Sequence, residues 1–600
     1  MRSREPRPRH RLSRRVLWAG LGAAAAIALA VVLLLSLGTE AGSAGPPDPV
    51  TVSPAPRDRW ASPQTQISLR GLPAGRLGTL RVSGSRSGSH TGTLKPHSDG
   101  EGASWVPDEA FDPGEKVHVE TDLTIPGADH GDYDFWTSRP AAPPPPRTAD
   151  QPGGAVQRFR SLPGLSIPAV SILKRTPEAT PGYTFLAPKR GSGDDGPMIV
   201  DDRGQVVWTH PVGADRQATD FRPQTLRGKP VLTWWEGVST VGVGFGEGVV
   251  LDDHYKELMR VHTGNGYKAD LHEFLITPRG TALMLSYAYV HRDLTAVGGP
   301  KEGLAIDGIV QEVDLQTGLV EFEWHTMDHI PLDESHWPLP PDATKDAYDF
   351  AHLNSISIDA DGDLLVSSRH TWTIYKVDRR TGSIRWRLGG KRSDFELAPD
   401  AAFAYQHDAA RRADGAITLF DNAASVSPQP GKHSRALALR LDEEHHTAAV
   451  AEQYPHPAGL LSETQGDYQT LPNGHVFVGW GAQPAFSEFT PDGKLVLDGR
   501  IANGNDNYRA YHGPWSGQPD TRPAVRVAGK RAYVSWNGAT NVARWQLLAG
   551  APGALRPAGE AAPTAFETAL PVPAGAKRVA VRALGPRGGT LSESAPVSGR

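Results

Sequence analysis

Three histidines and one arginine stand at equivalent points of successive sequence repeats. His272 lies in DLHEF, His352 in DFAHLN and His407 in YQHDA, and Arg369 follows His352 at the distance of a hairpin. Each histidine precedes a short strand-like run and a turn that ends in glycine. Residues at equivalent points of a repeat face a shared axis or surface. The pattern therefore predicts that the four side chains meet at one site for a negatively charged group.

These residue types suit the binding and attack of a sulfate or phosphate ester. Arginine matches a tetrahedral oxyanion because its planar fork donates two charge-assisted hydrogen bonds and stays protonated. A histidine, with a reference pKa of about 6.5, can act as a neutral nucleophile or as a general acid or base. Asn354 stands two residues after His352 and therefore shares its strand face. We expect Asn354 to help bind the ester.

The spacing of His352 and Arg369 predicts that they face each other across a hairpin. This register holds if the turn is centred between Ala360 and Asp361, whereas a three-residue loop would shift the pairing by one. Alternation along the strands predicts that the immediate neighbours of the site residues point away from the site and are structural. These neighbours are Glu273, His370 and Asp408.

Two further features of the site stay open from the residues alone. Trp235, in LTWWEG, ends an inner hairpin and is predicted to wall the pocket, with core filling as the alternative. Three histidines are also able to bind zinc. Because they lie in separate repeats with no carboxylate at ligand spacing, we expect neither a metal nor another cofactor.

The elements that position these residues are predicted to be strands. Glycine and proline are abundant, with 65 and 52 residues, and helical periodicity is scarce beyond the N-terminus, which favours an all-β chain. Between 168 and 519, hairpins with a glycine turn alternate with hairpins that begin at aspartate and end at a bulky residue, as in DRRTGSIRW. Two hairpins make a four-stranded blade, and the repeats predict a six-bladed β-propeller.

Smaller modules are expected on both sides of the propeller. Short alternating runs over 47–141 predict a β-sandwich, and a Pro-rich linker follows over 142–167. The segment 523–600 is predicted to be an immunoglobulin- or fibronectin-like β-domain, with closure of the propeller as the alternative.

The N-terminus predicts a membrane location. Residues 1–15 hold seven arginines and one glutamate, and 16–37 is an uncharged apolar run of a length that spans a bilayer. A basic cytoplasmic segment followed by a transmembrane anchor would place the bulk of the chain outside the cytoplasm in a single-pass protein. The alternative is a cleaved signal and a secreted chain.

Charge and cysteine content exclude other classes. The formal net charge of -5 leaves -11 for the chain after residue 15, which argues against nucleic acid as a partner. The absence of cysteine excludes disulfides and thiolate metal sites.

Several motifs in a joint order resemble the arylsulfotransferase family. They are LTWWEG, HLNSISID, QHDA, LFDNA and YRAYHGPW, between about Gly182 and Trp515. The resemblance implies a six-bladed propeller and ping-pong transfer of a sulfuryl group. In that scheme His407 is the nucleophile that becomes a sulfohistidine. His352, Asn354 and Arg369 would bind the sulfuryl oxygens, and His272 would complete the site.

The family also implies an aryl sulfate donor and a phenolic acceptor as partners, without a cofactor. Enterobacterial members carry a disulfide, which this chain cannot form. Two alternative functions remain from the sequence. One is a surface-anchored, non-catalytic propeller that binds an anionic ligand. The other is a quinoprotein-like dehydrogenase, which would bind a tricyclic quinone and calcium.

Overall fold

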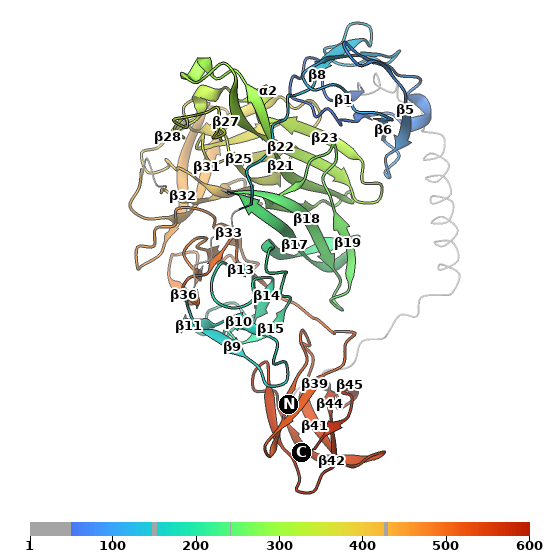
Figure 1. The fold of residues 1–600 in the computed structure, drawn as a ribbon. Helices are drawn as coiled ribbons and strands as arrows, with labels where there is room; N and C mark the ends of the chain where they lie inside the picture. Colours follow the sequence, from blue (N-terminus) through green and yellow to red (C-terminus); the bar gives the residue numbers. More distant parts are fainter. Residues whose placement is uncertain (1–49, 147–152, 241, 425–429, 600) are drawn as a thin grey trace, which may run out of the picture. The chain divides into compact units, whose positions relative to one another are not determined.

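The prediction of an all-β chain is confirmed by the computed structural model. The structure describes residues 50–146, 153–240, 242–424 and 430–599. It is 48% strand and 2% helix, and the strands form many separate sheets (Figure 1).

The predicted membrane localisation is wrong on the evidence of this structure. In the ranges that the structure describes, no helix is both long and apolar enough to cross a bilayer. The one α-helix there, α2, covers only Thr326–His329. The predicted basic segment 1–15 and the predicted anchor 16–37 both lie outside the described residues.

Residues 183–513 form antiparallel sheets in which strands that follow each other in the chain are neighbours. Three pairing orders come first: β38–β12–β14–β15, β16–β17–β18–β19 and β20–β21–β22–β23. Their bounds are β12 Tyr183–Leu186, β14 Met198–Val200, β15 Val206–Thr209, β16 Gln217–Leu226, β17 Lys229–Thr240, β18 Val243–Leu251, β19 Glu257–Val261, β20 Ala269–Ile276, β21 Thr281–Arg292, β22 Gly303–Asp314, β23 Val320–His325 and β38 Tyr511–Gly513. One residue pair, Gly246 with Ala269, joins the second and third groups into a continuous sheet.

Three further sheets follow the same plan, apart from β28, which pairs in parallel. They are β24–β25–β26–β27, β29–β30–β31–β32 with β28 added beside β32, and β33–β34–β35–β36 with β11 added beside β36. Their bounds are β24 Leu353–Ile358, β25 Leu364–Ser368, β26 Thr373–Val377, β27 Ile384–Gly389, β28 Glu396–Leu397, β29 His407–Arg411, β30 Ile417–Asp421, β31 Arg435–Asp442, β32 Thr447–Pro455, β33 Asp467–Thr470, β34 Val476–Gly479, β35 Ala485–Phe489, β36 Leu495–Ile501 and β11 Val170–Arg175.

Turn chemistry explains why the sequence repeats become hairpins. Asp378 opens the β26–β27 turn, where its carboxylate accepts hydrogen bonds from the backbone N–H groups of Arg380 and Thr381 at 2.8 and 2.9 Å. Such an Asx turn satisfies backbone donors that the tight loop leaves unpaired. Gly382 completes the turn at φ 73°, a conformation that costs glycine little. The recurrent aspartate and glycine of the outer hairpins therefore mark strand reversals.

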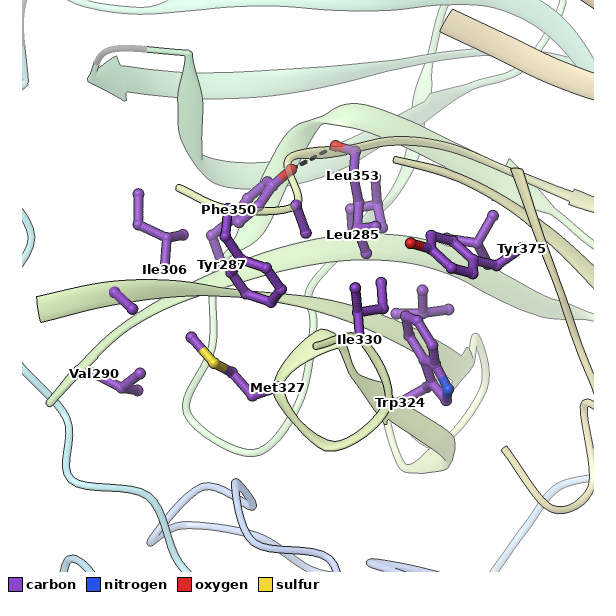
Figure 2. Close-up of a cluster of buried hydrophobic side chains, with 14 of the residues drawn as sticks. Leu285, Tyr287, Val290, Ile306, Trp324, Met327, Ile330, Phe350, Leu353 and Tyr375 are labelled. Carbon is purple, nitrogen blue, oxygen red and sulfur yellow. Dashed lines mark hydrogen bonds between the residues drawn. The ribbon is translucent and has the colours of Figure 1, made fainter. Parts of the chain in front are cut away.

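Between the third sheet and the next one lies the largest aromatic and aliphatic cluster of this region. Figure 2 shows Leu285, Tyr287, Trp324 and Leu353 packed in it, and all four are buried. The Tyr287 hydroxyl donates a hydrogen bond of 2.5 Å to the carbonyl of Leu353. The contact ties β21 to the start of β24, next to His352.

Pairs of smaller sheets precede and follow this region. Sheets β1–β2–β6–β5 and β4–β3–β7–β8 enclose one hydrophobic cluster, and so do β39–β40–β43 and β42–β41–β44–β45, as in a β-sandwich. The bounds are β1 Thr51–Ser53, β2 Ile67–Arg70, β3 Arg81–Gly84, β4 Gly88–His90, β5 Gly92–Pro96, β6 Gly102–Pro107, β7 Lys116–Glu120, β8 Tyr133–Trp136, β39 Ala524–Ala528, β40 Arg531–Ser535, β41 Arg544–Ala551, β42 Ala554–Ala561, β43 Thr568–Pro571, β44 Arg578–Leu584, β45 Thr590–Glu593 and β46 Val597–Ser598, which pairs with β44.

A buried ionic network joins the first strands of several sheets. The fully buried guanidinium of Arg509 contacts Asp220 of β16 at 3.1 Å and Glu273 of β20 at 3.0 Å. It also donates a hydrogen bond of 3.1 Å to the carbonyl of Asn354 in β24. Arg222 adds a second cation between the same two carboxylates. One side chain thus holds two strands of the continuous sheet, β16 and β20, against β24 of the next sheet.

We expect Arg509→Met to destabilise the protein by about 3–5 kcal/mol, because removal of one partner leaves buried carboxylates short of positive charge. The free energy of unfolding in urea measures this loss. Arg392→Met is the matched control, since Arg392 pairs with Asp333 at the exposed surface and should change stability little. Equal unfolding midpoints for the two variants would contradict the proposed contribution of the network to stability.

Candidate functional site

The four residues predicted to share a site do line one cavity, of about 560 Å³. His272 lies within β20, and His407 is the first residue of β29. His352 directly precedes β24, and Arg369 directly follows β25. The side chains therefore come from three neighbouring sheets.

The predicted pairing of His352 with Arg369 arises by a β-bulge. The hairpin itself is shifted by one residue from the simple register, since Ile358 pairs with Leu364. Asn354 is then an extra residue between the pairs Ser355–Ser367 and Leu353–Ser368. This bulge shifts the register back, and the N–H of Arg369 donates to the carbonyl of His352 at 2.9 Å. Bulges re-aim side chains in this way beside functional sites.

His407 is held as a neutral imidazole whose Nε2 carries the lone pair. Its Nδ1 lies 2.7 Å from Oδ1 of Asn422. The Nδ2 of Asn422 donates to the carbonyls of Ser462 and Gln465, both at 3.0 Å, so its Oδ1 must be the acceptor and His407 Nδ1 must carry the proton. The N–H of Gln465 donates to Nε2 at 3.2 Å. Burial, followed by the charge of Arg369, holds the pKa of His407 well below its usual value.

The other two histidines are each oriented by an aspartate. Nδ1 of His272 contacts Asp270. The carboxylate of Asp270 also accepts a hydrogen bond of 2.6 Å from the backbone N–H of Gly244. Nδ1 of His352 lies 2.5 Å from Asp349. Burial raises the pKa of Asp349, but His352 and His370 outweigh it and bring that pKa to about 2. Since both carboxylates occupy Nδ1, the Nε2 atoms of His272 and His352 are left for other partners.

Arg369 is a buried cation without a carboxylate partner among the described residues. Its Nη1 and Nη2 donate to Nε2 of His370 at 2.8 Å and to the carbonyl of Glu463 at 2.9 Å, while Nε has no hydrogen-bond partner there. The ring of Tyr405 lies 4.8 Å from the guanidinium carbon. Burial lowers the pKa of Arg369 to about 10. Such a charge is stabilised by an anion that enters the cavity.

The rest of the cavity wall is mixed, since it also holds polar and charged residues such as Lys189, Arg190 and Lys345. Its apolar and aromatic part, which we call the apolar collar, comprises Ala142, Pro144, Leu271, Tyr289, Leu304, Ile306, Trp337 and Ala347. The cavity therefore combines groups that favour an anion with side chains that favour an apolar group.

Comparisons with known proteins identify the family. Residues 222–503 match the family model described as Arylsulfotransferase (ASST). These residues belong to the arylsulfotransferase family. The comparison with curated proteins finds no match for the chain.

Solved structures give only distant likenesses. A protein of unknown function from Bacteroides caccae has a TM-score of 0.35 at 11% identity, and the match covers 55% of this chain and 98% of that one. Virginiamycin B lyase from Staphylococcus aureus has a TM-score of 0.28 at 9% identity, with coverages of 61% and 96%. Neither likeness bears on the activity of this chain.

Trp235 and Asn354, which were predicted to contact the substrate, do not line the cavity. Trp235 is fully buried in the core, and its indole N–H donates to the carbonyl of Ala269 at 2.8 Å. Its alternative, core filling, is therefore the correct one. Asn354 is also fully buried, and its Nδ2 donates to the carbonyl of Gln406 at 2.6 Å. Because Gln406 precedes His407, Asn354 positions the backbone of that histidine.

Alternation along the strands wrongly excluded His370 from the site. It lines the cavity and stacks on Trp337, with ring centres 4.4 Å apart. The strand β25 ends at Ser368, so alternation no longer governs the residues after it. Sequence reasoning also did not assign Tyr508 to the site, although this residue begins the YRAYHGPW motif; its ring centre lies 5.5 Å from that of His272 and 6.3 Å from that of His407.

Asp349, His352 and His370 are close enough together to hold a metal ion, with candidate ligand atoms within 4.8 Å of one another. Both histidines already hold hydrogen bonds in this group, since His370 Nδ1 lies 2.6 Å from the carbonyl of Asp349. Nε2 of His370 accepts from Arg369, which puts a fixed positive charge beside the group. The donor set thus fits a hydrogen-bonded network that supports Arg369 better than it fits a cation.

The tautomer and the low pKa of His407 are measurable by ¹⁵N NMR of protein labelled at histidine. We expect Nδ1 protonated and Nε2 unprotonated at pH 7, with no titration until well below pH 6.5. The His407→Gln variant lacks the ¹⁵N signals of this histidine and thereby identifies them in the wild-type spectrum. The unfolded chain binds this proton more readily below pH 6.5, so His407 should make the free energy of unfolding fall as the pH drops. A titration midpoint near 6.5 would contradict the assignment.

Proposed function

We propose that the chain transfers a sulfuryl group from an aryl sulfate to a phenolic acceptor through a sulfohistidine at His407. The observation that carries the proposal is the neutral, buried His407 with its lone pair on Nε2, beside the guanidinium of Arg369, which has no carboxylate hydrogen-bond partner among the described residues. A nucleophile and an oxyanion donor thus line the same cavity.

In the first half-reaction, Nε2 of His407 attacks sulfur and forms the N–S bond. The S–O bond to the aryl group breaks, and its electron pair leaves on the phenolate oxygen. Arg369, which lines the cavity and has no carboxylate hydrogen-bond partner among the described residues, would bind the sulfuryl oxygens where negative charge gathers. In the second half-reaction the oxygen of a phenol attacks the same sulfur. The N–S bond breaks, its electron pair returns to Nε2 of His407, and a base takes the proton of the phenol.

His272 and His352 are the candidates for these proton transfers. Each carries an aspartate at Nδ1, which orients the ring and stabilises the protonated form. Their ring centres lie 5.0 Å apart, so both can serve the same oxygen position. The apolar collar, which includes Tyr289 and Trp337, fits an aryl group above that position.

The proposed architecture is a six-bladed propeller over 168–519. It is supported by the four-stranded sheets, by contacts between their first strands, and by β38, which pairs with β12 and joins distant parts of the chain in one sheet. We further propose a β-sandwich over 47–141, a linker over 142–167 and an immunoglobulin- or fibronectin-like domain over 523–600, on the basis of the sheet pairs described above.

His407→Asn should abolish both covalent labelling and burst. Wild-type protein mixed with a chromogenic aryl sulfate, without acceptor, should release one phenol per site and retain one sulfuryl group on His407, discharged when phenol is added. Stopped-flow absorbance and peptide mass spectrometry measure the two signals.

His445→Asn is the matched control, because His445 is exposed and remote from the cavity lining, and it should keep the full burst. A burst that persists in His407→Asn would refute the nucleophile. Saturable binding of the aryl sulfate by wild-type protein without any burst would favour the non-catalytic anion-binding function.

Arg369→Lys should lower the rate of the burst by about a hundredfold or more. Lysine keeps the charge but loses the planar fork, as when one oxyanion donor is removed. The measurement is the single-turnover rate at saturating donor, with the circular dichroism spectrum as a check of folding. Arg392→Lys, at the exposed surface, is the control. A rate near that of the wild type would contradict the role of Arg369 as an oxyanion donor.

A further inference from the structure

A short segment outside the family-matched residues forms part of the cavity wall. This segment, which we call the proline strap, comprises Ala141 to Pro146 and follows the sheet that contains β8. Ala142 and Pro144 line the same cavity as His407 and Arg369. The strap precedes the matched region, which begins at residue 222.

The strap is fixed to β21 by backbone contacts at its start. The N–H of Ala141 donates to the carbonyl of Tyr289 at 2.7 Å, and the N–H of His291 donates to the carbonyl of Arg139 at 2.9 Å. Between these bonds, Pro140 and Val290 form an antiparallel bridge. The attachment strand is the one whose Tyr289 ring lines the cavity.

The sequence of the strap explains why pairing stops where the cavity begins. Residues 143–146 are all proline and have no N–H to continue the ladder. Consecutive prolines adopt a stiff, extended polyproline conformation. The chain therefore continues past β21 as a semi-rigid rod, and it needs little further loss of conformational entropy to serve as a wall.

The cavity wall also includes side chains from β22 and from the segment that leads into β24. Leu304 and Ile306 belong to β22, and Trp337 stacks on His370 beside Arg369. Together with Ala142 and Pro144 they belong to the apolar collar. An ester whose sulfuryl group is bound by Arg369 and His407 would extend its organic part toward the apolar collar.

We infer that the proline strap determines the size of the organic group that the site accepts. This inference rests on the proposed function. Ala142 and Pro144 present small, inflexible surfaces, so the width of the collar is set by the backbone of the strap. A change of one methylene in a hydrophobic pocket alters discrimination by about 10–200-fold.

The test compares a one-ring donor, 4-nitrophenyl sulfate, with a two-ring donor, 4-methylumbelliferyl sulfate. In the full chain, Ala142→Leu should narrow the collar and lower the ratio of kcat/KM for two rings over one by about tenfold or more. Pro144→Gly should raise the same ratio, since it removes both bulk and stiffness.

Pro143→Ala is the matched control, because Pro143 lies in the strap but not in the cavity lining, and it should leave the ratio unchanged. An unchanged ratio in both Ala142→Leu and Pro144→Gly, with normal folding, would overturn the inference.

Failure of the proposed function itself would appear differently, as a wild-type protein that turns over neither donor. The strap is then tested by equilibrium binding of 4-nitrophenyl sulfate and of 4-methylumbelliferyl sulfate. The same shifts in the ratio of Kd values are expected, and their absence would overturn the inference.

Discussion

One buried guanidinium connects the sheet framework to the chemistry. Arg509 binds carboxylates of β16 and β20 and the carbonyl of Asn354 in β24. Charges of this kind are costly to bury unless they are fully paired, so each strand is fixed relative to the others by the need to satisfy the group. Because Asn354 lies at the bulge beside His352, the same contact sets the position of a site histidine.

The distribution of counter-charges distinguishes the roles of the site residues. His272 and His352 each hold an aspartate, whereas His407 holds the neutral amide of Asn422. A carboxylate at that place would favour the protonated ring, and the amide avoids this while still fixing the tautomer. Arg369 has no carboxylate partner among the described residues, which leaves its charge for an incoming anion. The same low-dielectric surroundings keep His407 neutral and strengthen the hydrogen bonds that Arg369 can donate to an anion.

Sequence reasoning succeeded where repetition constrained it. Equivalent positions in successive repeats placed His272, His352, Arg369 and His407 at one cavity, and the motifs indicated the family. It failed where local rules ended. Alternation excluded His370, although the residue lies beyond the end of β25, and it placed Asn354 at the ester, although that residue is the extra one of a bulge.

The sequence by itself determined the all-β character, the turns at aspartate and glycine, and which four side chains converge, because these depend on local periodicity and on repetition. Only the tertiary structure decided the tautomer of His407, the isolation of the Arg369 charge, the burial of Trp235 and the approach of the proline strap to the cavity. Each of these depends on partners whose proximity no local pattern records. Examples are Asn422 and Gln465, which lie 15 and 58 residues from His407, and Tyr289, which binds the proline strap. The physical reason is that burial and hydrogen-bond satisfaction are properties of the packed chain.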